Sequence, residues 1–359
     1  MDENGNFEEF FTDVMKVSRE KTALTRAVIE AQKGVYDKNP DNTDFVAFVP
    51  FCPSRCKYCS FITRDLKHSA PLAGEYADAL VKEIEYSAKF VKKLRSIYVG
   101  GGTPVALSDE NLVKVLKAVE KINTGVEFTV EAGRPDRITK ENLAILKDFG
   151  VTRICVNPQT FSDETLKRIG RNHTAAEAIE KYLLAKEDFS VNMDFIAGLE
   201  GENFSTFEKS IKKAIELSPD DITVHSLCIK HGAYLAEEKD RVDCAEIEKM
   251  VEFAEKALSD AGYRPYYLYR QKYMAGNLEN VGYAKPGKEC VYNVDTMEEI
   301  SSTVACGAGA ISKRVDFGGG RIERLASPKD VKTYLGKISE IEEKKKVFFA
   351  ETPENKSKT

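Results

Sequence analysis

Short apolar runs alternate with amphipathic segments from about residue 44 onward. The runs are rich in Val, Ile and Phe, which is typical of buried strands, whereas the segments between them repeat apolar residues at helical spacing. Two of the helical segments, 108–122 and 139–150, begin with Ser and Thr, which favour helix N-termini. The pattern predicts six β/α units, with strands at 45–51, 95–101, 126–132, 152–158, 191–198 and 221–227.

Six such units predict a parallel sheet with helices outside, as an open doubly wound sheet or as a full or partial barrel. In either form, functional side chains gather at the carboxyl ends of the strands. The cysteine-rich segment after the first strand, "GGGTP" after the second, and Glu131, Asp194 and His225 fall at these ends. We expect the strand interiors to be apolar and the site to lie at this rim.

The rest of the chain departs from the repeat. We predict a helical N-terminal arm at residues 1–43 and the core at 44–230. A smaller mixed α+β subdomain at 231–345 is expected to cover the rim, and 346–359 to form a tail. A long helix is expected near 242–261 and a hairpin that turns at "DFGGG".

Composition narrows the class of protein. The 359 residues are 42% hydrophobic with a formal net charge of -5, which suits a large core and no basic surface for nucleic acid. The sequence has neither a membrane-length apolar run nor a basic-then-apolar leader, so we expect a cytoplasmic protein without membrane insertion. Eight unevenly spread cysteines do not form the framework of a small secreted domain.

Three of those cysteines, Cys52, Cys56 and Cys59, fall within eight positions directly after the first strand. They lie among Pro, Ser, Arg and Lys, whereas structural cysteines are normally isolated and buried. Structural zinc takes four ligands, and His68 is the nearby imidazole; a catalytic zinc with three thiolates is conceivable. A [4Fe-4S] cluster fits the odd count better, since three cysteines leave one iron for a non-protein ligand.

The C-x3-C-x2-C spacing, with Tyr58 before the third cysteine, resembles the signature of the radical S-adenosylmethionine (SAM) superfamily. "FVPFCPSRCKYC", "YVGGGTP", "FTVEAGRPD", "VNPQTF", "GRNHT", "NMDFIAGLEGE" and "GAGAIS" resemble, in order and spacing, the oxygen-independent coproporphyrinogen III dehydrogenase family. The segment from "PYYLYRQK" to "ECVYN" resembles its HemZ-like branch. The resemblance covers residues 44–340 and implies an α/β fold with a partial (β/α)6 TIM-type barrel of parallel strands.

The resemblance also implies roles for individual residues. Cys52, Cys56 and Cys59 would hold a [4Fe-4S] cluster whose open iron binds the amino and carboxylate groups of SAM. One or two SAM molecules would be contacted by Tyr58, Gly101, Gly102, Thr103, Glu131, Gln159, Arg171, Asp194 and Ile311. Three positions depart from the family pattern, which commonly has Tyr, His and Cys where this chain has Val46, Phe48 and Phe61.

The activity that the resemblance implies is oxidative decarboxylation of two propionates of coproporphyrinogen III to vinyl groups, in haem biosynthesis. Such a tetrapyrrole carries four carboxylates, so cations beside aromatic rings are candidate contacts. We predict that Arg270 in "YYLYRQK" binds one propionate carboxylate. Arg64 and Lys67 are further candidate cations. An unidentified electron donor is implied as a partner.

Alternatives stay open at this point. Relatives with the same core include haem chaperones and haem-modifying radical SAM proteins, and a zinc module is a third class. The N-terminal arm favours a dehydrogenase, because chaperone relatives begin almost at the first strand. The arm is also shorter than in HemZ-like proteins, which raises the question of an abbreviated start.

Overall fold

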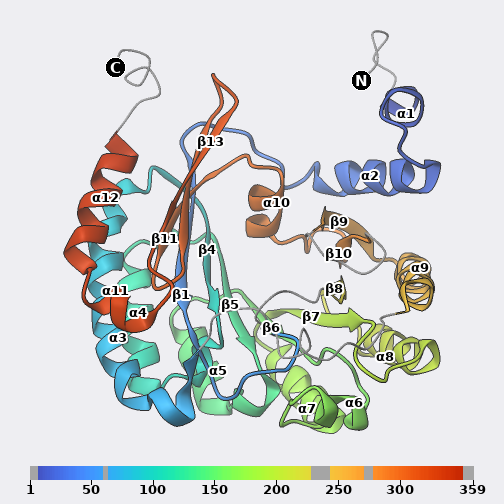
Figure 1. Cartoon of the computed structure of the whole chain (residues 1–359), viewed down its shortest axis with the longest axis horizontal. Helices are drawn as coiled ribbons and strands as arrows, with labels where there is room; N and C mark the ends of the chain where they lie inside the picture. Colours follow the sequence, from blue (N-terminus) through green and yellow to red (C-terminus); the bar gives the residue numbers. More distant parts are fainter. Residues whose placement is uncertain (1–6, 60–63, 228–242, 271–277, 351–359) are drawn as a thin grey trace.

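A mixed sheet of eleven strands forms the framework of the computed structural model, which describes residues 7–59, 64–227, 243–270 and 278–350 (Figure 1). The strand order is β13-β12-β11-β1-β4-β5-β6-β7-β8-β10-β9. The six central strands are parallel and follow chain order: β1 Asn42–Val49, β4 Lys93–Gly101, β5 Glu127–Gly133, β6 Arg153–Val156, β7 Ser190–Ala197 and β8 Asp221–Ser226. They coincide with the six predicted runs, so the α/β class and the parallel core are confirmed.

Helices connect these strands on the convex side of the sheet (Figure 1). The connecting helices are α3 Leu66–Ser87, α4 Asp109–Glu120, α5 Lys140–Asp148, α6 Asp163–Arg168, α7 Ala175–Ala185 and α8 Phe204–Leu217. A two-residue parallel pair, β2 Phe51–Cys52 with β3 Arg64–Asp65, flanks the cysteine segment.

The expected helix caps are present. The Ser108 side chain accepts a hydrogen bond from the Asn111 amide at the start of α4. At the start of α5, Thr139 and Asn142 form a reciprocal capping box, which satisfies two amide groups that the helix itself leaves unpaired.

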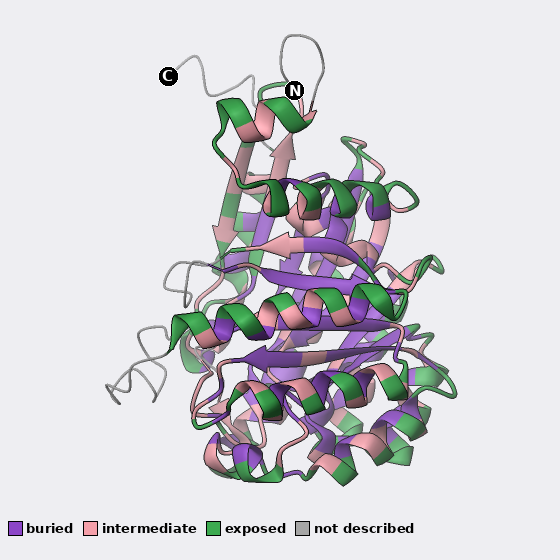
Figure 2. Ribbon diagram, turned by 90° about the vertical axis from the view of Figure 1, so that its right-hand side faces the viewer, coloured by how far each residue is buried: buried purple, intermediate pink, exposed green. Residues whose placement is uncertain are grey.

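The two faces of the parallel strands differ in polarity, because successive side chains of a strand point to opposite faces. Outward residues such as Phe128, Val130 and Ile154 pack in one hydrophobic core with the covering helices. Figure 2 shows that the strands are mostly buried, whereas the helices combine buried and exposed residues. Inward residues are often polar even within the strands, and they include Thr129, Arg153, Asn192, Asp221 and Thr223. The expectation of apolar strand interiors is therefore wrong for the concave face.

The C-terminal third continues the core sheet at both edges. β11 Ser302–Cys306 pairs in parallel with β1, and the β12 Ile311–Asp316 and β13 Arg321–Ala326 hairpin extends that edge. At the other edge β10 Asn280–Ala284 pairs antiparallel with β8, and β9 Arg264–Tyr269 follows. The predicted hairpin at "DFGGG" is confirmed, whereas the domain boundaries at residues 43, 230 and 345 stay predictions.

The remaining helices lie at the edges. α9 Cys244–Asp260 covers the β7–β9 side, and α10 Val291–Met297 contacts both β4 and β9. α11 Val331–Leu335 and α12 Ile338–Ala350 pack against α3, so residues 346–350 of the expected tail belong to a helix.

The N-terminal arm is helical as predicted. It comprises α1 Phe7–Glu9, a π-helical turn at Phe10–Val14 and α2 Arg19–Gln32. The α2 helix packs on β9, and the Gln32 side-chain amide donates to the Tyr266 carbonyl oxygen at 2.9 Å. Among the described residues, no helix is both long and apolar enough to cross a membrane.

A buried ion pair joins α3, α12 and β11. Lys345 donates to Glu83 at 2.8 Å, and both side chains are almost fully excluded from solvent. Glu83 also accepts from the Gly307 amide and the Tyr334 hydroxyl, while Lys345 lies 3.2 Å from the Cys306 sulfur. These contacts fix the turn after β11 against the helices.

Replacing Lys345 by Met is expected to lower the free energy of unfolding by about 3–5 kcal/mol, because it leaves the Glu83 carboxylate buried without its partner. Urea unfolding of the apo-protein measures the change. The Glu83→Gln/Lys345→Met double variant is expected to recover much of the loss. Lys344→Met removes an exposed pair with Glu340 and is expected to change stability by less than about 0.5 kcal/mol. Equal losses in Lys344→Met and Lys345→Met would contradict the account.

Candidate functional site

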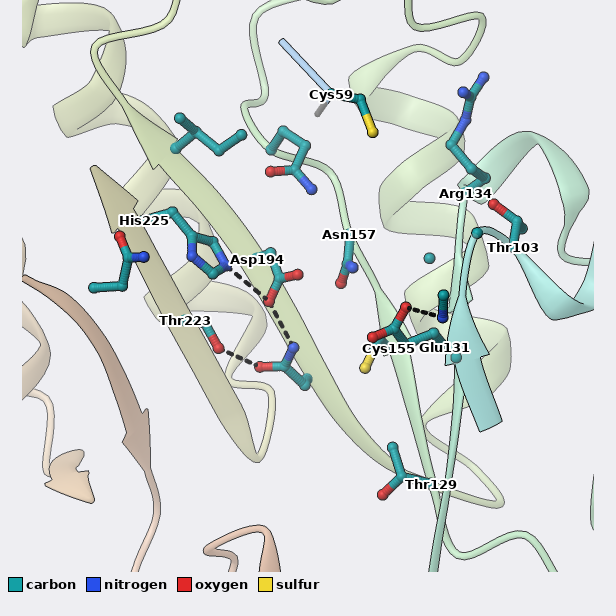
Figure 3. Close-up of a pocket in the computed structure, with 18 of the residues that line it drawn as sticks. Cys59, Thr103, Thr129, Glu131, Arg134, Cys155, Asn157, Asp194, Thr223 and His225 are labelled. Atoms are coloured by element: carbon teal, nitrogen blue, oxygen red, sulfur yellow. Dashed lines mark hydrogen bonds and ion pairs between the residues drawn. The ribbon is translucent and has the colours of Figure 1, made fainter. Parts of the chain in front are cut away.

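A cavity of about 500 Å³ lies on the concave face of the sheet, between the carboxyl ends of the parallel strands and the cysteine segment (Figure 3). The predicted cluster and SAM contacts line it, except Ile311, whereas the predicted substrate cations Arg270, Arg64 and Lys67 do not. Those that line it are Cys52, Cys56, Tyr58, Cys59, Gly101, Gly102, Thr103, Glu131, Gln159, Arg171 and Asp194.

The cysteine segment is anchored to neighbouring elements by backbone hydrogen bonds. The Lys57 backbone amide donates to the Ile169 carbonyl oxygen at 3.0 Å, and within the segment the Cys59 backbone amide donates to the Cys56 carbonyl oxygen at 3.1 Å. The Cys52 sulfur lies 3.4 Å from the Thr103 hydroxyl. Phe61, one of the three departures from the family pattern, lies outside the described residues.

The glycine triplet lets the end of β4 approach this segment closely. The Gly102 and Thr103 amides donate to the Val49 and Phe51 carbonyl oxygens, both at 2.7 Å. A Cβ atom on Gly102 would lie 2.4 Å from the Phe51 oxygen. Gly101 has φ 108°, a conformation that side-chain-bearing residues rarely adopt. Glycine is therefore required at position 102 by the close contact with the Phe51 backbone and at position 101 by the backbone conformation.

Glu131, at the end of β5, accepts hydrogen bonds from the Tyr98 hydroxyl and from the Gly101 amide, the latter at 3.3 Å. Burial raises the pKa of Glu131 above its usual value, although the bond from Tyr98 acts in the opposite direction. The carboxyl group faces the cavity at the point where β4 and β5 end, where it can accept from a polar ligand (Figure 3).

Asp194 on β7 belongs to a polar network that reaches β8 (Figure 3). Its carboxylate accepts from the Asn192 amide at 2.8 Å and lies 3.8 Å from His225. Burial acts to raise the pKa of Asp194, but His225 and the Asn192 amide outweigh burial and hold it below its usual value. The Thr223 hydroxyl donates to Asn192 at 3.2 Å, so the carboxylate is held in one orientation.

Arg171 joins the cysteine segment to β6. It donates to the Tyr58 hydroxyl at 2.8 Å and to the Asn157 carbonyl oxygen at 3.1 Å. Nearby Gln159 has φ 69°, and its backbone N–H donates to the Asp194 backbone carbonyl oxygen at 2.9 Å. Asn157, Gln159 and Arg171 each keep a buried polar atom with no partner among the described residues, and all three residues line a cavity that can hold a polar ligand.

The remaining predicted residues lie elsewhere. Ile311 begins β12, is 49% exposed and does not line the cavity. Arg270 is exposed and directly follows Tyr269, whose side chain does line the cavity. Arg64 is paired with Asp330, on the α11 side of the fold. Val46 and Phe48, the other two departures from the family pattern, form part of the cavity wall.

Sequence reasoning missed several lining residues, most of them within the strands. They are Tyr98, Thr129, Cys155, Asn157, Asn192, Thr223, and Tyr267 and Tyr292 from the C-terminal third. The available signal was the two-residue period: Asn192 lies two positions before Asp194, and Thr223 two before His225, so each pair shares a strand face. Tyr267 and Tyr292 gave no such signal, because tertiary packing brings them to the cavity.

The donor set fits an iron-sulfur cluster with a polar ligand. Among the residues that the structure describes, no three His, Cys, Asp or Glu side chains converge as they would around a single metal ion. The three cysteines instead line one end of a cavity whose mixed wall also carries the polar side chains of Glu131, Gln159 and Asp194. A cluster binds each cysteine at a different iron, which suits thiols spread along a loop.

Fold and site together define a radical SAM protein, and the model of the radical SAM superfamily matches residues 46–214. The HemZ protein of Bacillus subtilis, an oxygen-independent coproporphyrinogen-III oxidase-like protein, is 36% identical over 94% of this chain and 71% of its own length. The haem chaperone HemW of Haemophilus influenzae is 30% identical over 80% of this chain and 74% of its own. The chain belongs to the coproporphyrinogen-III oxidase-like family of the radical SAM superfamily, in the branch of HemZ.

A solved structure supports the fold. The coproporphyrinogen III oxidase HemN of Escherichia coli matches with a TM-score of 0.67 and 21% identity, over 90% of this chain and 73% of HemN. Membership of the superfamily implies a [4Fe-4S] cluster and SAM.

Gly102→Ala is expected to reduce iron and sulfide bound after anaerobic reconstitution and to lower stability by about 1–3 kcal/mol, because the new Cβ atom overlaps the Phe51 backbone. Iron and sulfide analysis and the urea midpoint measure the two effects. Gly74→Ala is the matched control: it lies in α3, where a Cβ atom meets nothing closer than 3.8 Å. Full cluster content in Gly102→Ala would refute the packing argument.

Proposed function

We propose that this protein catalyses oxidative decarboxylation of coproporphyrinogen III, converting two propionates to vinyl groups and giving protoporphyrinogen IX. The observation that carries the proposal is the gathering of the three cysteines and the polar residues Glu131 and Asp194 around one cavity. Each propionate loses a hydrogen atom, carbon dioxide and one electron, which passes to an acceptor. Reduced cluster and SAM together supply a 5'-deoxyadenosyl radical for the hydrogen abstraction.

The residues of the chain have distinct tasks in this proposal. Cys52, Cys56 and Cys59 hold the cluster, and the glycine-bearing end of β4 keeps their loop in place. Glu131 and Asp194 orient the polar groups of SAM, because both carboxyl groups are held by neighbouring donors. Gln159 and Arg171 contribute the unpartnered atoms described above, to one SAM molecule or to a second.

The substrate carboxylates require cations near the mouth of the cavity. Arg55, on the cysteine segment, is exposed and lines the cavity. Arg270 remains our candidate for a propionate contact, since it follows Tyr269 at the end of β9 and a guanidinium group binds carboxylate in a bidentate manner. An electron donor completes the reaction.

A second candidate function is haem binding and transfer, as the name of the HemW relatives describes for those proteins. The specific observation in its favour is that Val46 and Phe48 line the cavity where the dehydrogenase pattern has Tyr and His. Two apolar side chains there provide no proton-transferring group.

Anaerobic turnover separates the candidates. Reconstituted protein with reductant, SAM and coproporphyrinogen III is expected to form vinyl products and 5'-deoxyadenosine, followed by mass spectrometry. Cys56→Ser is expected to abolish both, whereas Cys244→Ser alters an exposed cysteine and is the matched control. Stable haem binding without decarboxylation would favour the chaperone. Bound zinc without iron-sulfur absorbance would overturn both.

Asp194→Asn is expected to weaken SAM binding by about 10–100-fold, the loss typical of a hydrogen bond to a charged group. Calorimetric titration of the reconstituted protein measures the affinity. Asp188→Asn changes an exposed carboxylate and is expected to leave the affinity unchanged. If both variants bound SAM like the unchanged chain, Asp194 would have no place in the cofactor site.

A further inference from the structure

Arg134 follows directly after β5, and its side chain is buried. It reaches back to the cysteine segment, where one guanidinium nitrogen donates to the Ser54 carbonyl oxygen at 3.3 Å and another to the Ser54 hydroxyl at 3.2 Å. Ser54 lies between Cys52 and Cys56. The guanidinium group is therefore attached to the loop that carries the cluster ligands.

The same group contacts a ligand sulfur. Its Nη1 atom donates to the Cys56 Sγ at 3.5 Å, within the reach of a hydrogen bond to sulfur. On its other side Asp136 accepts from Nε at 2.9 Å and from Nη2 at 3.1 Å, in a bidentate fork. The carboxylate holds the guanidinium plane in one orientation and partly balances its charge.

Hydrogen bonds to the cysteine sulfurs and the net charge nearby are two determinants of an iron-sulfur cluster's reduction potential. A cation that donates to sulfur favours the more negative, reduced cluster, so it raises the potential. A carboxylate next to that cation disfavours the reduced cluster and lowers the potential. Burial strengthens both effects, because the surroundings screen charge less than water does. Arg171 is a second buried arginine beside this loop, but its guanidinium group donates to the Tyr58 hydroxyl, whereas that of Arg134 donates to a cysteine sulfur.

We propose that Arg134 and Asp136 form a pair that sets the reduction potential of the cluster bound by Cys56. Arg134 raises the potential through its hydrogen bond and charge, and Asp136 limits that increase while orienting the guanidinium group. Both are positioning residues, because they act through the cysteine ligand. The inference rests on the proposed function, since it requires the [4Fe-4S] cluster.

Redox titrations followed by electron paramagnetic resonance test the pair in the reconstituted full chain. Arg134→Gln is expected to shift the cluster midpoint to a more negative value, and Asp136→Asn to a more positive one. Arg137→Gln, an exposed arginine three residues along, is the matched control and is expected to leave the midpoint unchanged. Shifts of opposite sign are the mark of an electrostatic role, because a loosened loop has no reason to follow the sign of the charge removed.

An unchanged midpoint in Arg134→Gln, or shifts of the same sign in both variants, would overturn the inference. If Arg134→Gln retains no cluster, the test is the midpoint potential of Asp136→Asn compared with that of Arg137→Gln. A midpoint in Asp136→Asn that is not more positive would then overturn the inference. Iron and sulfide contents measured in parallel identify cluster loss. Failure of the unchanged chain to form a [4Fe-4S] cluster would overturn the proposed function as well, whereas unmoved midpoints with an intact cluster overturn this inference alone.

Discussion

The alternation of side chains along six parallel strands is the constraint on which the rest of the structure depends. Each strand offers one face to the helices and the other to the concave side of the sheet. The outward face is apolar and forms the core with α3, α4, α5 and α8. The inward face does not have to pack in this core, so it can carry the polar side chains of Glu131, Asn192 and Asp194. Stability and chemistry occupy opposite faces of the same strands.

The cysteine segment depends on close backbone packing. The glycines at the end of β4 allow Gly102 and Thr103 to bond the chain on either side of Pro50, which leads into the cysteines. Farther away, the buried Glu83–Lys345 pair holds the turn at Gly307. A Cβ atom on Gly307 would lie 2.4 Å from the Phe48 carbonyl oxygen, so this turn also packs on the end of β1. Helices on the convex side thereby support the cavity rim.

Several charged groups around the cavity have a polar partner close by. Arg134 faces Asp136, Arg153 faces Asp221, and Asp194 faces His225. Such pairing limits the cost of burying each charge and fixes its direction. For a protein of the radical SAM superfamily, polar groups that are already oriented can hold a cofactor without further rearrangement. The apolar Val46 and Phe48 set this cavity apart from the common dehydrogenase pattern.

The sequence by itself determined the six strands, the helices between them and the place of the three cysteines after the first strand, because period, capping and spacing are local properties. The family resemblance of its motifs implied that Glu131, Gln159, Arg171 and Asp194 belong with the cysteines, and all four line the same cavity. Only the tertiary structure decided that residues after 277 extend the sheet at both edges and that Tyr267 and Tyr292 reach the cavity. It also placed Arg134 on the Cys56 sulfur. These contacts join residues far apart in the chain, and their partners are set by packing.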